Sequence, residues 1–382
     1  MSFHDSKKRK RNVVVHQGSD EVDTSKPSAV FTPTGGRQHT LSIALPGSVI
    51  ANAQTHETKT LLAAQVARAC AVFSVDEIVV FNDGQSQAQP KKRSAYDYRD
   101  DETGYTGYSD PDDFLYHVLS YLETPPHLRK SLFPMHPNLR TAGMMPSLDM
   151  PHHLRANEWC RYREGISVSV EGTEAQQAKR KKPSSATPDT YTLVDCGLPV
   201  RARIPVSVPT DSRITVRFAS DLEPRMDGYT PLDAAAVTPD TPREEAGYFW
   251  GYSTRLASSL SAIFTECPYD GGYDVSVGTS ERGIPVSSLL SASQNSEGGD
   301  IPPIPAKWNH LIIVFGGVAG LEVALKADKE LTSKGVSEAR DVFDYWVNLV
   351  PNQGSRTIRT EEAVWLGLMG LRGVVQERLD AV

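Results

Sequence analysis

The residues whose types and spacing could do chemistry lie near the C-terminus, in two loops that each follow an apolar run. Segment 311–317 is apolar and ends in two glycines, which let the backbone approach a flat group closely. A second apolar run, 347–350, leads into the polar segment 352–359. Thr360 is then a predicted helix N-cap, with acidic residues in the first turn. Two such loops at neighbouring strand ends would form a ligand pocket.

The glycine spacing narrows the choice of ligand. Gly316-Gly317-x-x-Gly320 is neither the dinucleotide fingerprint Gly-x-Gly-x-x-Gly nor a phosphate-binding loop with Lys and Ser or Thr. Nucleotide phosphate binding and a nicotinamide or flavin oxidoreductase are therefore not favoured. A lone motif of this kind is more often a packing turn between strand and helix. The polar second loop shifts the interpretation towards a ligand.

Composition sets broad limits. The chain has 382 residues, a formal net charge of -7 and 39% hydrophobic residues, as expected for a soluble protein of two or three domains. Its four cysteines are widely spaced and fit neither a zinc site nor a disulfide framework, so we expect reduced thiols and no bound metal. We expect no membrane span and no signal peptide.

The pattern of apolar residues predicts an α/β domain in two parts. Residues 1–37 are expected to be a disordered basic tail. The first part, 38–155, opens with the alternation strand, helix, strand that implies a parallel sheet, and contains a mobile insertion at 84–110. The second part, 246–382, has a predicted helix over 256–264 and a strand at 273–278.

Between these parts, 156–232 has the period-two pattern of short strands and predicts a small inserted β-barrel. Arg201, Arg203, Arg213 and Arg217 lie on the opposite faces of two of its strands, as in a nucleic-acid-binding barrel. Solvation of the outer face of a half-buried sheet explains these arginines slightly better.

Four motifs together resemble one known family. They are GSRTIRTEEA (354–363), FGGVAGLE (315–322), GTSERG (278–283) and HPNLRTAGMMPSLDMPHH (136–153). The chain resembles the SPOUT RNA methyltransferases, specifically the archaeal and eukaryotic branch with an inserted OB-like barrel. The resemblance implies an α/β fold with a C-terminal trefoil knot, S-adenosylmethionine bound in the knot, and a homodimer. It also implies large-subunit rRNA as substrate and N3 of a uridine as the methyl acceptor.

The resemblance also implies roles for particular residues. The cofactor-binding residues would be Phe315, Gly316, Gly317, Gly320, Leu349, Asn352, Gln353, Thr357 and Ile358. A uracil nitrogen must lose its imide proton before it is methylated, and arginines aimed at the ring oxygens would stabilise the resulting anion. Candidates for the catalytic groups are Arg356, Arg359, Arg282, Arg255 on the predicted helix, and Glu281 as proton acceptor. Each arginine could instead form an intersubunit or loop-fixing salt bridge.

Two further features leave alternatives open. Segment 136–153 is expected to be a packed loop along the RNA path, with Arg140, His152 and Arg155 as contacts, although plain packing explains it equally well. The basic run 7–11 predicts nuclear import, and the resemblance implies the nucleolus. Methylation at another base position or a ribose oxygen is an alternative. So is a non-catalytic RNA-binding ribosome-assembly or mitotic-structure factor with a vestigial cofactor pocket.

Overall fold

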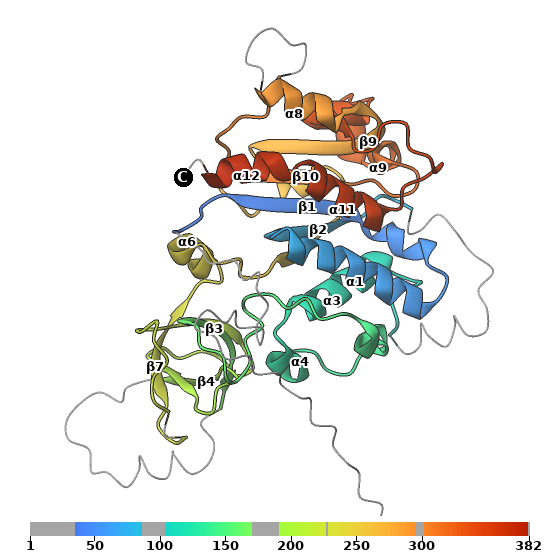
Figure 1. The fold of residues 1–382 in the computed structure, drawn as a ribbon. Helices are drawn as coiled ribbons and strands as arrows, with labels where there is room; N and C mark the ends of the chain where they lie inside the picture. Colours follow the sequence, from blue (N-terminus) through green and yellow to red (C-terminus); the bar gives the residue numbers. More distant parts are fainter. Residues whose placement is uncertain (1–34, 86–103, 170–190, 227, 295–301, 381–382) are drawn as a thin grey trace, which may run out of the picture. The chain divides into compact units, whose positions relative to one another are not determined.

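A six-stranded sheet in which every strand is parallel organises the protein (Figure 1). The structure, a computed structural model, describes residues 35–85, 104–169, 191–226, 228–294 and 302–380. The strand order is β11-β9-β10-β1-β2-β8. The strands are β1 (Thr40–Pro46), β2 (Glu77–Phe81), β8 (Ser253–Ala257), β9 (Val275–Pro285), β10 (His310–Val314) and β11 (Tyr345–Asn348).

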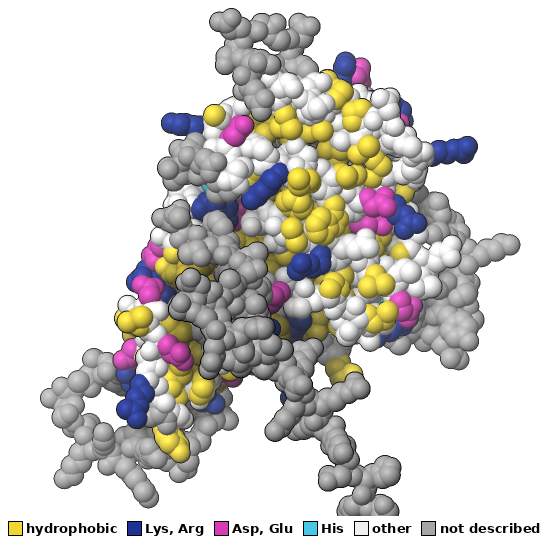
Figure 2. All heavy atoms as spheres, in the orientation of Figure 1, with side chains coloured by type: hydrophobic (Ala, Val, Ile, Leu, Met, Phe, Trp, Pro, Cys, Tyr) yellow, Lys and Arg dark blue, Asp and Glu magenta, His cyan; other side chains and the backbone are white. Residues whose placement is uncertain are grey.

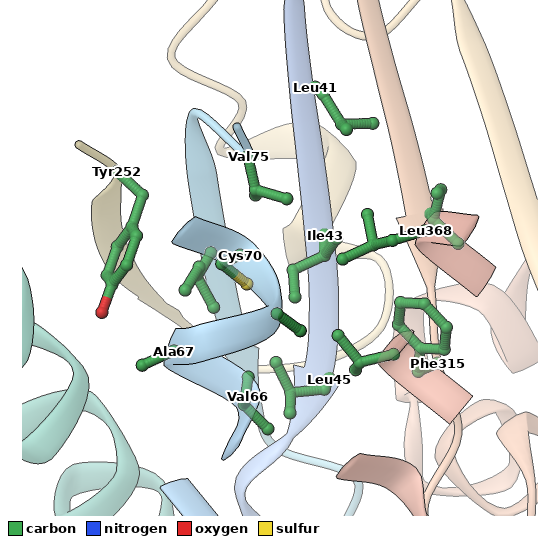
Figure 3. Packing of buried hydrophobic residues seen from close by; sticks show 14 of the residues in the cluster. Leu41, Ile43, Leu45, Val66, Ala67, Cys70, Val75, Tyr252, Phe315 and Leu368 are labelled. Carbon is green, nitrogen blue, oxygen red and sulfur yellow. The ribbon is translucent and has the colours of Figure 1, made fainter. Parts of the chain in front are cut away.

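Helices cover both faces of this sheet. Leu41, Ile43 and Leu45 of β1 belong to one apolar cluster, whereas Ala44 belongs to the other, as the alternation of a strand requires. The first cluster includes α1 (His56–Val72), α3 (Pro111–Glu123), α8 (Val286–Gln294), α11 (Thr360–Gly370) and α12 (Arg372–Asp380). The second includes α7 (Ala262–Thr265), α9 (Leu321–Ala327), α10 (Lys329–Ser333) and η4 (Ala339–Val342). Figure 3 shows Ile43 and Leu45 between α1 and the C-terminal residues Phe315 and Leu368.

Local sequence explains where the first two long helices begin. Thr55 caps α1, because its hydroxyl accepts from the backbone N–H of Thr58 at 3.2 Å while Thr58 Oγ1 accepts from the N–H of Thr55 at 3.1 Å. Asp110 caps α3 by accepting from the N–H of Asp113 at 3.0 Å. Short helices and turns complete this part: η1 (Gly47–Asn52), α4 (Pro126–Leu132), η2 (Pro137–Leu139), η3 (Ala142–Met144) and α6 (Thr241–Ala246).

The middle of the chain forms the predicted β-barrel. Five strands close in the order β3-β4-β5-β7-β6 around a core that includes Val194, Ile204 and Val216. The last strand continues to Val237, five residues beyond the expected boundary at 232. The strands are β3 (Tyr162–Val168), β4 (Thr192–Asp195), β5 (Ala202–Ile204), β6 (Arg213–Phe218) and β7 (Leu232–Val237).

A buried ionic link joins the barrel to α3. Arg213 of β6 donates to both carboxylate oxygens of Glu123, at 2.6 and 2.9 Å, and to Glu164 of β3 at 2.7 Å. Burial alone would raise the pKa of Glu123, but Arg213 holds that pKa far below its ordinary value. His152 and Trp250 also donate to these two carboxylates. Arg213 is therefore a structural residue, whereas Arg203 forms an exposed pair with Asp233.

One prediction about local structure is wrong, and another falls mostly outside the described residues. Residues 253–257 form the edge strand β8, and only the short helix α7 follows, so no helix spans 256–264. In the expected mobile insertion, residues 104–110 are ordered and Tyr105 is buried in the core, while 86–103 lie outside the described residues. The tail 1–34 and the basic run 179–182 also lie outside them. Among the described helices, none is long and apolar enough to cross a membrane.

The ionic link predicts a large difference between two barrel arginines. Arg213→Ala leaves two buried carboxylates without their cation and should lower the free energy of unfolding by about 3–5 kcal/mol. Arg203→Ala removes an exposed pair and should cost about 0–1 kcal/mol. Urea denaturation of both variants measures the difference. Equal effects would show that the Glu123–Arg213 link does not stabilise the fold.

Candidate active site

A cleft of about 960 Å³ lies at the carboxyl ends of the parallel strands. Three walls come from the loop 316–322 after β10, the segment 279–282 of β9 and the segment 348–363 that joins β11 to α11. A fourth wall, Asn52–Gln65, was not predicted. Strand pairing could have predicted this wall. Because β1 pairs in parallel with β10, the loop that follows β1 must reach the same edge of the sheet.

The glycine loop exposes backbone to the cleft because no side chain fits there. A Cβ atom at Gly316 would lie 2.9 Å from Gly320 Cα and from the nitrogen of Leu321. Gly320 has a φ of 77°, a left-handed conformation that favours glycine, and its N–H donates to the carbonyl of Gly317 at 3.0 Å. This tight turn forms a cradle for a flat ligand group.

The polar segment after β11 is fastened directly to the glycine loop. Thr360 Oγ1 donates to the carbonyl oxygen of Gly316 at 2.9 Å. Thr360 is the first residue of α11 and not its N-cap; the cap is Arg359, whose backbone N–H donates to Glu362 at 2.9 Å. Gln353 spans the turn by donating to the carbonyl of Ser355 at 2.9 Å. The two predicted loops therefore form one site.

Most of the predicted cofactor-binding residues line the cleft. Phe315 does not: its side chain is buried beneath α11, where a Cβ on Gly367 would lie 2.8 Å from the ring. Asn352 holds a left-handed turn, with a φ of 59°, and is not among the lining residues. Those that do line it are Gly316, Gly317, Gly320, Leu349, Gln353, Thr357 and Ile358.

Four of the five predicted catalytic residues also line the cleft: Arg356, Arg359, Arg282 and Glu281. All four are exposed. Arg282 lies 3.5 Å from Glu322, and Arg359 lies 3.9 Å from Glu361. Both guanidinium groups are exposed and these distances are long for an ion pair, so the two arginines can turn towards a bound anion.

Among the predicted catalytic residues, Arg255 is the one that does not line the cleft. It lies on β8, away from the cleft, where its Nε donates to Glu77 at 2.8 Å and its Nη2 to the carbonyl of Ile263 at 2.6 Å. Because Glu77 is almost completely buried, Arg255 neutralises an interior charge. The apolar spacing of this segment suggested a helix, and the predicted position of Arg255 was therefore wrong.

The segment 136–153 is a packed loop. His152 is buried and its Nε2 lies 2.9 Å from Glu123 Oε1, so it is not available to RNA, contrary to prediction. Burial lowers the pKa of its neighbour His153 to about 3. Arg140 stacks over Tyr105 at 5.0 Å, and both Arg140 and Arg155 keep exposed surface. Among the described residues, no group of three His, Cys, Asp or Glu side chains could hold a metal.

The cysteines form no disulfide and are all free. Cys70 and Cys196 are buried, and burial raises the pKa of both thiols well above the ordinary value. The other two are partly buried. None is therefore prepared as a nucleophile.

The split parallel sheet, the cleft at its carboxyl edge and the inserted barrel all lie within residues 40–371. Residues 40–371 fit the family described as "Putative RNA methyltransferase". The chain belongs to this family of RNA methyltransferases, as the sequence motifs predicted.

Three relatives that share one name are each matched over most of the chain. The "28S rRNA (uridine-N(3))-methyltransferase" of Homo sapiens is 40% identical over 345 residues, which cover 89% of this chain and 80% of the human protein. The protein of the same name from Drosophila melanogaster is 39% identical and is matched over 90% of this chain and 64% of its own length. That of Mus musculus is 40% identical over 337 residues.

Alanine substitution should destabilise the protein at one of two arginines and leave its stability nearly unchanged at the other. Arg255→Ala leaves Glu77 buried without its cation and should lower the free energy of unfolding by about 3–5 kcal/mol. Arg356→Ala removes an exposed side chain at the cleft and should change it by less than about 0.5 kcal/mol. Thermal or urea denaturation measures both variants. A stable Arg255→Ala protein would contradict the structural role assigned to Arg255.

Proposed function

We propose that this protein uses S-adenosylmethionine to methylate N3 of a uridine in large-subunit rRNA. The observation that supports this proposal most directly is the hydrogen bond from Thr360 to the glycine loop. This bond joins the two motifs into one cleft lined by backbone. The names of the human, fly and mouse relatives support the same substrate.

The described residues fit the proposed cofactor. The backbone of Gly316, Gly317 and Gly320 offers a close surface for a flat ring, and Leu349 and Ile358 add apolar area. Gln353 and Thr357 offer hydrogen-bonding groups on the facing wall. When bound, S-adenosylmethionine supplies an activated methyl group on a cationic sulfur.

The cleft residues would prepare the uridine. Arg282, Arg356 and Arg359 are positioned to stabilise negative charge on the uracil oxygens as N3 loses its proton. Glu281 is exposed at the same wall and is the proposed proton acceptor. By holding the deprotonated base in line with the methyl group, the cleft supplies positioning as well as charge.

Calorimetry with S-adenosylmethionine tests whether the cleft holds the cofactor. The unmodified protein should bind, and Gly316→Ala should bind at least about tenfold more weakly because the new Cβ collides with the Gly320 backbone. Gly373→Ala is the matched control: it lies in α12, outside the residues that line the cleft, has open space around it and should bind normally. If the unmodified protein does not bind, the enzymatic proposal fails and a non-catalytic RNA-binding role is favoured.

Mass-spectrometric mapping of rRNA nucleosides tests the target. Cells without this protein should lose N3-methyluridine at a large-subunit position, and the unmodified gene product should restore it. Arg356→Ala should restore much less, because the uracil anion loses part of its stabilisation, by about 10²-fold in rate. Loss of a different modified nucleoside would overturn the N3 assignment while leaving RNA methylation in place.

We also propose that the C-terminal chain is knotted as in SPOUT enzymes. The backbone at Gly283 on β9 packs so closely against Val347 of β11 that a Cβ would lie 2.4 Å from its carbonyl carbon. The segment after β11 then crosses to the glycine loop, where Thr360 is bonded to Gly316. Tracing the chain in a crystal structure tests this proposal. A path that does not thread a loop contradicts it.

A homodimer is the proposed assembly. Leu61 and Val72 of α1, with Leu366 and Met369 of α11, are exposed apolar residues on two adjacent helices. Phe73 and Trp365 join the helices, with ring centroids 5.8 Å apart. Figure 2 shows apolar side chains gathered on the face where α11 and α1 lie in front. Because both helices also line the cleft, a second copy placed there would help to enclose it.

Analytical ultracentrifugation tests the dimer. The unmodified protein should sediment with twice the mass of the chain, and Met369→Glu should sediment as a monomer because a charge cannot be buried without a partner. Met135→Glu, at a fully exposed methionine outside these helices, is the control and should remain dimeric. A monomeric unmodified protein would contradict the proposal.

RNA binding by the barrel and nuclear localisation complete the proposal. Arg201 and Arg203 keep exposed surface on the barrel, where they could contact phosphates. The basic run 7–11 supports nuclear import, and the rRNA substrate supports the nucleolus. Fluorescence of a fusion with and without residues 1–37 tests the location, and an unchanged distribution would contradict the role of the run.

A further inference from the structure

A buried carboxylate lies directly behind the glycine loop. Asp83, just after the end of β2, has only 3% of its surface exposed. Its Oδ2 accepts a hydrogen bond from Ser48 Oγ at 2.6 Å, and its Oδ1 accepts one from the N–H of Gln85 at 3.0 Å. Among the residues that the structure describes, no Lys, Arg or His forms an ion pair with it. A buried charge without a counter-ion is costly, so it is uncommon outside functional sites.

The charge of Asp83 acts on its surroundings. Asp112 lies nearby, with its Oδ2 2.7 Å from Asn82 Nδ2. Burial, followed by the charges of Asp110 and Asp83, raises the pKa of Asp112 to about 7. Asp83 therefore places negative charge in this part of the protein, behind the cleft.

The backbone of Gly317 separates Asp83 from the cleft. A Cβ atom added to Gly317 would lie 3.3 Å from Asp83 Oδ2 and 3.4 Å from Ser48 Oγ. Gly317 itself lines the cleft. Asp83 therefore lies behind the glycine loop, whereas Arg282, Arg356 and Arg359 lie on other walls together with the carboxylates Glu281, Glu322 and Glu361.

We propose that Asp83 is a specificity-determining residue that favours the cationic cofactor over its neutral-sulfur product. This inference rests on the proposed use of S-adenosylmethionine. A buried negative charge one backbone layer away attracts a sulfonium ion through a medium of low dielectric constant. The arginines on the opposite side serve the nucleic acid and the uracil anion.

Methyl transfer removes the positive charge on sulfur, and this change would affect turnover. During transfer the bond between the methyl carbon and sulfur breaks, its electron pair stays on sulfur, and a bond from N3 to the methyl carbon forms. The imide proton has gone to a proton acceptor or to water. Sulfur is then a neutral thioether, so the attraction to Asp83 is lost when the methyl group leaves. Asp83 would thereby promote the exchange of product for fresh cofactor.

Three ligands separate this electrostatic role from a purely structural one. S-adenosylmethionine carries a sulfonium cation, sinefungin carries an ammonium group at the equivalent position, and S-adenosylhomocysteine carries neutral sulfur there. Dissociation constants for all three should be measured by calorimetry with the unmodified protein, Asp83→Asn and Ser48→Ala. Asp233→Asn, which removes an exposed carboxylate on the barrel, is the control. Thermal denaturation checks that each variant is folded.

Asp83→Asn should reduce the preference for the two cationic ligands over S-adenosylhomocysteine by about tenfold. Ser48→Ala and Asp233→Asn keep the charge of Asp83 and should keep the preference. Equal weakening of all three ligands, or no change in the preference, overturns the inference and leaves Asp83 as a loop-fixing residue. If Asp83→Asn does not fold, the test uses the unmodified protein alone. Binding of S-adenosylhomocysteine that is as tight as that of the two cationic ligands, or tighter, then overturns the inference. Binding of none of the three ligands contradicts the proposed function instead.

Discussion

All strands of the main sheet are parallel, and the cleft depends on that constraint. Parallel strands place all their carboxyl ends at one edge, so the loops after β1, β2, β9, β10 and β11 must meet there. The sheet is buried on both faces, which requires nearly continuous apolar strands such as 311–314. Polar and glycine residues are then concentrated where these strands end. The site is thus a consequence of how the core is built.

The sequence predicts those features that depend on local patterns. Strands β1, β2 and β10 and helices α1, α3 and α11 follow from apolar periodicity and caps, and the barrel follows from its period of two. The prediction for segment 253–257 was wrong because an edge strand buries few of its residues, and Leu256 is 44% exposed. In addition, the spacing of Leu256 from later apolar residues matches that of a helix. Glu77, the buried partner of Arg255, lies 178 residues away in the chain, beyond the reach of any local pattern.

Most of the predicted site residues line one cleft because their motifs are contiguous. Each loop is a short stretch whose backbone conformation is set by glycines and polar side chains. The wall 52–65 was missed because its polar residues look like an ordinary helix start, and only strand pairing brings them across from Arg356. The family resemblance assigned Phe315 to the cofactor, yet strand alternation turns its side chain into the core.

The division of the sheet by the barrel also affects how the protein can fold. Strand β1 pairs with β10, so Thr40 must find His310, 270 residues further along the chain. Until the ribosome has released β10, one edge of β1 has no partner and exposes backbone groups. Pairing over such separations is slow, and unpaired edges invite aggregation. The barrel has all its strands between residues 162 and 237, so it can close before the sheet that surrounds it in sequence is complete. Chaperone demand during synthesis should therefore come from the sheet and not from the barrel.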